Sequence, residues 1–155
     1  MGRRVGLFTV VLAFVILVVP AATTANGQTS TLFVGMGDSI GEGVQSADAN
    51  FFTQGFSFPN LIAWRMSARF PIPLISTNPF ASVSSVQGRP RIDPRVRTLN
   101  LAVSGADAES LLNDAATATE VSQIDSETEL VLFPWLGSQM QVAEQIRPAR
   151  VACWI

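Results

Sequence analysis

The chain has 155 residues, of which 48% are hydrophobic and 14% charged, and its formal net charge is −2. This balance argues against nucleic-acid binding, because no basic excess is present to displace counterions from phosphates. One cysteine excludes an internal disulfide framework, and the lack of histidine argues against the usual zinc sites. We therefore expect neither a metal nor a cofactor. A chain without histidine also cannot run Ser-His catalysis on its own.

The N-terminus has the pattern of an export signal. Two arginines precede an apolar run over residues 5–19, and small residues follow it. This order is typical of a secretory signal peptide. A membrane anchor is the alternative, but the run is shorter than the roughly 20 residues that a bilayer span needs. We expect a signal peptide over 1–25, cleaved after Ala25 with Ala22 as the second choice, and a secreted chain without a stable membrane span.

The next segments predict a strand, a glycine-rich turn and a helix. Residues 31–35 are β-branched and aromatic, which is typical of a buried strand. Four glycines lie within 35–43 and permit close backbone approach. Residues 58–70 carry apolar side chains at helical spacing. We expect the inner face of this helix to contain Leu61, Trp64 and Ala68, with Phe70 as a further candidate.

The segment 75–97 lacks a clear period and predicts a long surface excursion. We expect a solvated face for its arginines, with contact to an anionic substrate or surface as the alternative: Arg89, Arg91, Arg95 and Arg97. The aromatic residues before the predicted helix could line an acyl pocket or pack in an ordinary core or loop: Phe51, Phe52, Phe56 and Phe58.

The second half of the chain alternates predicted strands and helices. Residues 97–103 predict a core strand, and a helix follows over 108–118. Ser138 is the expected N-cap of a helix over 139–146, which Pro148 ends. Residues 149–155 predict a third core strand, in which Cys153 would be a small buried hydrophobe. This alternation predicts an α/β fold with a parallel sheet.

Ser39 stands just after the first predicted strand, in the glycine-rich turn that opens a helix. A hydroxyl there projects at the carboxyl edge of the sheet, where open α/β folds bind ligands. Backbone N–H groups of such a turn can face an oxyanion formed beside the hydroxyl. A phosphate-binding turn and a purely structural turn are the alternatives.

Two blocks resemble the GDSL, or SGNH, hydrolases. Gly37-Asp38-Ser39-Ile40 differs from the family name only by isoleucine for leucine, and the segment 100–106, Asn-Leu-Ala-Val-Ser-Gly-Ala, resembles the second block. The third block, Gly-x-Asn-Asp, would begin directly after residue 155. A rival candidate over 137–140 has glutamine and methionine where asparagine and aspartate belong.

The resemblance implies a three-layer α/β/α, flavodoxin-like fold, of which residues 26–155 would be the N-terminal part, incomplete at the C-terminus. It implies that Ser39 is the nucleophile of an ester hydrolase and a backbone oxyanion donor, and that Gly105 is a second backbone donor. Gly37 and Asp38 would support the turn. The substrate would be a small-molecule, lipid or glycan ester.

The family's third oxyanion donor, an asparagine, and its late Asp-x-x-His block have no counterpart in this sequence. Asp107 and Glu109 are the nearest carboxylates that could replace the base, but an exposed carboxylate is a weak base. We therefore expect no useful esterase activity from this chain alone. The alternative function is a non-catalytic extracellular module that binds acyl or glycan ligands.

Overall fold

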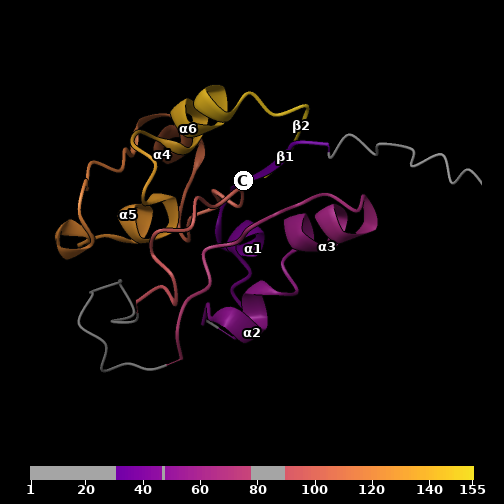
Figure 1. Cartoon of the computed structure of the whole chain (residues 1–155), viewed down its shortest axis with the longest axis horizontal. Coiled ribbons are helices and arrows are strands. Elements are labelled where there is room, and N and C mark those ends of the chain that lie inside the picture. The colour runs from indigo at the N-terminus through magenta and orange to yellow at the C-terminus, as the bar shows by residue number, and fades with distance from the viewer. Residues whose placement is uncertain (1–30, 47, 78–89) are drawn as a thin grey trace, which may run out of the picture.

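The chain is a mixed α/β structure built around two parallel strands (Figure 1). The computed structural model describes residues 31–46, 48–77 and 90–155. Within these ranges the elements, in order, are β1 (Phe33–Gly37), α1 (Ser39–Glu42), α2 (Phe51–Gln54), α3 (Phe58–Arg65), α4 (Ala108–Asn113), the 3-10 turn η1 (Val121–Gln123), α5 (Glu127–Leu132), α6 (Gln139–Ile146) and β2 (Arg150–Trp154). The predicted α/β class with a parallel sheet is confirmed.

β1 is the centre of the fold, and all five of its residues are buried. Its side chains alternate between two faces, as the pleat of a strand requires. Val34 and Met36 pack in one cluster with residues of α4 and α6. On the other face the ring of Phe33 lies 5.1 Å from that of Phe70, just beyond α3. The helices α4 and α6 therefore lie on one side of β1, and α1 and α3 on the other (Figure 1).

α3 confirms a helix that begins at Phe58, but it ends at Arg65 and not at residue 70, and the expected inner face is wrong. Leu61 and Trp64 are 48% and 79% exposed, whereas Pro59 and Ala63 are buried. The cause is close packing on β1. A Cβ placed on Gly35 would lie 2.7 Å from the Cβ of Pro59, so the helix approaches the strand backbone directly. Only small side chains fit such a contact.

The predicted strand over 97–103 forms only in part. This segment runs beside β1, where the N–H groups of Leu101 and Val103 donate to the carbonyl oxygens of Gly35 and Gly37 at 2.8 and 3.0 Å. Its single ladder bridge joins Asn100 to Gly35. The Thr98 hydroxyl accepts from the Asn100 N–H at 3.1 Å and donates to the Asn100 carbonyl at 2.7 Å. Such local side-chain bonds compete with a regular ladder.

The C-terminal elements follow the prediction except in their burial. Ser138 caps α6 by accepting the Gln141 N–H, and the helix ends at Arg147 in the left-handed region. β2 then pairs with β1 in parallel, from Phe33 opposite Arg150 to Gly37 opposite Trp154. Most of β2 is exposed, including Cys153, so the expected buried core strand is wrong. β2 is an edge strand in the described part of the chain, with β1 as its one partner.

One arginine of the predicted excursion is buried instead of solvated. Arg91 is 4% exposed, and its guanidinium donates to the carbonyl oxygens of Phe133 and Val96. These carbonyls satisfy the two terminal NH2 groups of the guanidinium, whereas its buried Nε has no partner among the described residues. Arg95 and Arg97 are exposed, as expected.

Two of the sequence predictions, the signal peptide over 1–25 and the position of Arg89, lie outside the described residues. Within the described ranges, no helix is both long enough and apolar enough to span a bilayer.

Candidate active site

Ser39 is the first residue of α1 and follows the carboxyl end of β1, where it is half-buried. Asp38 orders this turn in two ways. Its carboxylate accepts the Ile40 N–H at 2.9 Å, and its own N–H donates to the Trp154 carbonyl at 3.0 Å. The turn that presents Ser39 is therefore fixed both locally and by the last residues of β2.

Position 37 requires glycine, because of its backbone conformation and its close contact with β2. Its φ is +131°, and a Cβ there would lie 1.8 Å from the Trp154 carbonyl oxygen. The buried Gln139 side chain binds the same glycine twice: its Oε1 accepts the Gly37 N–H at 2.8 Å, and its Nε2 donates to the Gly37 carbonyl at 3.0 Å. α6 thus holds the residue two positions before the candidate nucleophile.

The second sequence block is bonded directly to α1. The buried Asn100 amide donates to the Gly41 carbonyl at 2.9 Å. Glu42, at the end of α1, accepts on Oε2 the N–H of Ser104 at 2.8 Å and also the Ser104 hydroxyl. Because these contacts join α1 to the loop over 104–106, the two blocks form one unit at the carboxyl edge of β1.

Gly105 lies in this loop, exposed, with a φ of +79°. It follows Val103 by two residues, just as Ser39 follows Gly37, and Val103 is bonded to Gly37. Ser39 and Gly105 therefore follow two paired segments at the same edge. Within the described ranges, neither the Ser39 nor the Gly105 backbone N–H donates a hydrogen bond.

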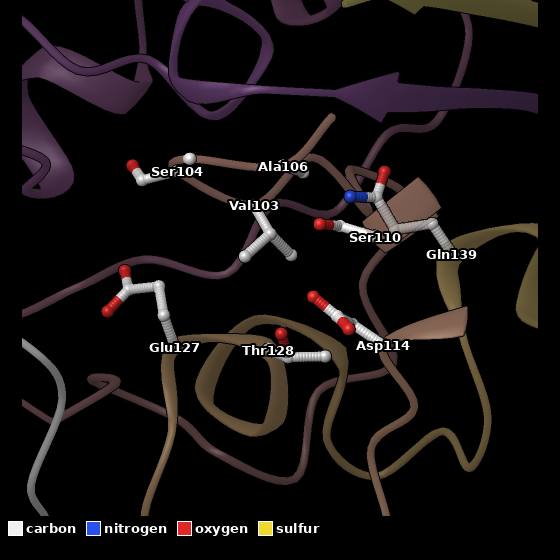
Figure 2. A pocket seen from close by; sticks show the side chains of 9 residues that line it. Val103, Ser104, Ala106, Ser110, Asp114, Glu127, Thr128 and Gln139 are labelled. Carbon is white, nitrogen blue, oxygen red and sulfur yellow. The ribbon is translucent and has the colours of Figure 1, made fainter. Parts of the chain in front are cut away.

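A polar cavity of about 100 Å³ opens beside Gly105 (Figure 2). It lies between the loop over 103–106, α4, α5 and the start of α6, and is lined by Val103, Ser104, Gly105, Ala106, Ser110, Asp114, Glu127, Thr128 and Gln139. In Figure 2 the polar ends of Ser110 and Asp114 face the same space. Ser39 is not among the lining residues, so the cavity contains one of the two predicted donors.

Two buried carboxyl groups meet next to this cavity. Glu42 is fully buried and Glu127 is 7% exposed. Burial raises the pKa of Glu42 to about 8, and the negative charge of Glu127 adds to this rise. Burial of this kind favours the protonated form of a glutamate. As an acceptor of the Ser104 N–H, Glu42 still positions the loop that carries Gly105.

The carboxylates considered as a replacement base are poorly suited to that role. Asp107 is the N-cap of α4 and accepts the Ser110 N–H and hydroxyl at 2.8 and 3.0 Å. These bonds lower its pKa, so its carboxylate is a weaker base than an ordinary aspartate. Glu109 is exposed in the first turn of the same helix.

Two of the aromatic residues considered for an acyl pocket, Phe52 and Phe56, are 65% and 68% exposed.

The buried polar residues that hold the site together were not predicted from the sequence. Asn100 lies inside the second block, where a polar residue within an apolar run was the available signal, and Glu42 follows the first block within the glycine-rich turn. Gln139 belongs to the rival third block, yet it serves as a clamp on Gly37. No local signal marked Glu127, which the path of α5 brings to the cavity. No group of three His, Cys, Asp or Glu able to hold a metal ion occurs in the described ranges.

Comparison of the whole chain with protein-family models, with curated proteins and with solved structures found no match.

Proposed function

We propose that the chain carries the nucleophile turn and two oxyanion donors of an exported serine ester hydrolase of the GDSL/SGNH type. One observation carries the proposal: the Ser39 turn and the Gly105 loop share one sheet edge and are bonded together through Glu42 and Ser104. A hydroxyl beside free backbone N–H groups suits acyl transfer, because these groups can stabilise the negative charge of a tetrahedral intermediate.

In the proposed chemistry, the Ser39 oxygen attacks an ester carbonyl and the carbonyl oxygen becomes an oxyanion. The N–H groups of Ser39 and Gly105 bind this oxyanion. When it collapses, the alcohol leaves and an acyl-enzyme remains, which water hydrolyses. The serine proton needs a base, and the 155 residues contain no histidine. We therefore propose that this chain alone has no useful turnover, because only binding and oxyanion stabilisation remain without the base.

The finer fold belongs to the same proposal. A three-layer, flavodoxin-like arrangement is supported by β1, which has helices on both sides and a parallel partner. Export through a signal peptide over 1–25 is supported by the sequence pattern alone. The substrate would be a small-molecule, lipid or glycan ester.

Acetylation by p-nitrophenyl acetate tests the nucleophile without requiring turnover. The purified chain is incubated with the ester at pH 8, and acetylated serines are mapped by peptide mass spectrometry. We expect Ser39 to be acetylated first, because the Ser104 and Ser110 hydroxyls are already bonded to Glu42 and Asp107. The matched variant Ser39→Ala should lose this adduct. Acetylation spread evenly over the serines would contradict the proposal.

Turnover is measured separately with short-chain p-nitrophenyl esters. After the single equivalent released by acetylation of Ser39, the wild-type chain should release p-nitrophenol at the same background rate as Ser39→Ala. Serine-dependent release well above that rate would show that a base is present after all and would overturn the proposed lack of activity.

A further inference from the structure

The outer face of α3 carries large apolar side chains together with a positive charge. Pro59 and Ala63 are buried toward β1, whereas Leu61, Trp64 and Arg65 are exposed. Trp64 and Arg65 follow Leu61 by three and four positions, so the three side chains are neighbours on one helix face. Tryptophan is highly buried on average, and contiguous exposed apolar groups mark interaction sites.

The turn before α3 extends this apolar surface. Phe52 and Phe56 are both mostly exposed, and they lie one turn apart because the Phe56 N–H donates to the Thr53 carbonyl oxygen at 2.9 Å. The Asn60 side chain of α3 donates to the Gly55 carbonyl oxygen at 2.7 Å and joins the two segments. The exposed apolar side chains therefore belong to adjacent elements, α2 and α3 (Figure 1).

Positive charge is concentrated in the same part of the sequence. The segment 51–92 contains four arginines and no acidic residue, although the whole chain has a net charge of −2. Two of these arginines, Arg65 and Arg69, are exposed. Neither guanidinium forms a salt bridge or a hydrogen bond with another residue in the part of the chain that the structure describes. Their charge is therefore available to a negatively charged partner.

Arg69 also lines a cavity that suits an anion with an apolar chain. The cavity has a volume of about 280 Å³, and Arg97 lines it as well. The Arg97 guanidinium is held over an aromatic ring, 4.8 Å from the centroid of Trp135. The other lining residues are apolar: Leu32, Pro71, Leu99 and Trp135. Two cations beside apolar walls match a negative headgroup that carries a hydrocarbon chain.

We propose that this surface binds an anionic lipid bilayer. The α3 surface is formed by Phe52, Phe56, Leu61, Trp64, Arg65 and Arg69. Aromatic and leucine side chains beside arginines are typical of segments that lie at the membrane interface, where the rings enter the headgroup boundary and the cations attract anionic lipids. A second copy of this chain is a poorer occupant, because a two-fold contact would bring the arginines of both α3 surfaces together. The proposal goes beyond the ester chemistry and does not depend on it.

A local fluorescent label tests the proposal in the full chain, whatever residues 1–25 bind. Cys153, the one cysteine, is replaced by serine, and a nitrobenzoxadiazole label is attached to Leu61→Cys or to the matched control Leu112→Cys. Leu61 and Leu112 are 48% and 51% exposed, and α4, which carries Leu112, lies on the opposite side of β1 from α3. Substitutions at such exposed positions change stability little, and urea unfolding verifies that both labelled chains are folded.

The probes are vesicles of phosphatidylcholine alone and of phosphatidylcholine mixed with phosphatidylglycerol. We expect the label at position 61 to gain intensity and shift to the blue with the mixed vesicles, and the label at position 112 to remain unchanged. High salt should reverse the change, because it screens the attraction. An equal response at both positions, an equal response to neutral vesicles, or no response at position 61 would overturn the proposal. A response that grows with protein concentration in the absence of vesicles would assign the surface to a second copy instead.

Variants test the contribution of the charges. The double variant Arg65→Gln with Arg69→Gln should weaken binding to the mixed vesicles by about tenfold or more, since each arginine near an anionic membrane contributes about a fivefold gain. The control Arg147→Gln removes an exposed arginine at the end of α6, on the other side of β1, and should leave binding unchanged. Equal losses in the two would refute the site. Ser39→Ala should bind as wild type does, so failure of the acetylation test leaves this surface unaffected.

Discussion

We expect alanine substitution at Gly37 to destabilise the folded chain at the turn that carries Ser39. At a φ of +131° a side chain is strained, which costs about 1–3 kcal/mol. The new Cβ would also lie 1.8 Å from the Trp154 carbonyl oxygen, and a shift of this backbone adds about 1–3 kcal/mol as overpacking. We expect Gly37→Ala to lose about 2–6 kcal/mol of the free energy of unfolding, a large share of the roughly 5–15 kcal/mol typical of a domain.

Alanine substitutions at two other glycines distinguish backbone strain from overpacking as the cause of this loss. Gly105 has a φ of +79° but no atom within 4 Å of an added Cβ, so Gly105→Ala carries backbone strain alone, about 1–2 kcal/mol. Gly55 has a φ of −59° and only ordinary contacts at 3.6 Å and beyond, so Gly55→Ala should be neutral or slightly stabilising. The assay is urea unfolding followed by tryptophan fluorescence. If Gly37→Ala is no less stable than Gly105→Ala, the packing argument is refuted.

Three further predictions concern the buried polar residues and the exposed face of α3. The pKa of Glu42 is raised in the folded state, so the wild-type chain should lose stability as pH rises from about 5 to 8, and Glu42→Gln should remove much of this loss. If the urea midpoint depends on pH equally in the wild type and in Glu42→Gln, this prediction is contradicted. Gln139→Met leaves the buried Gly37 N–H without a partner, while the Gly37 carbonyl keeps its bond from the Val103 N–H, and should cost about 1–3 kcal/mol in the same unfolding assay. Trp64→Ala should change stability by no more than about 0.5 kcal/mol, whereas Leu101→Ala should cost about 2–5 kcal/mol. If Trp64→Ala loses as much stability as Leu101→Ala, Trp64 packs in the core.

Local patterns predicted where helices and strands begin. They did not predict which side chains are buried, because burial depends on long-range packing. Ser138 marked the start of α6 because an N-cap acts within three residues. Trp64 was misplaced because the side of α3 that faces β1 depends on how closely Gly35 lets the two approach. Cys153 was misplaced because burial of a strand depends on what covers it. The sequence of a five-residue apolar run is the same in a central strand and in an edge strand.

The polar network of the site was beyond prediction for a related reason. Glu42 and Glu127 are 85 positions apart in number, and neither has a sequence neighbour that signals a buried carboxyl pair. Ser39 and Gly105, in contrast, were identified because each lies in a recognisable block. The sequence thus indicated the candidate reacting groups, and the structure supplied the residues that hold them in place.

The contacts of Gly37 also constrain the order in which the molecule can assemble. Gln139, which binds this glycine, stands 102 positions later in the chain, and the Trp154 carbonyl that fixes Asp38 comes later still. Contacts of such long sequence separation form late, because a large loop must close before they stabilise anything. During synthesis the Ser39 turn therefore leaves the ribosome among the first folded-domain segments but is among the last to reach its final geometry.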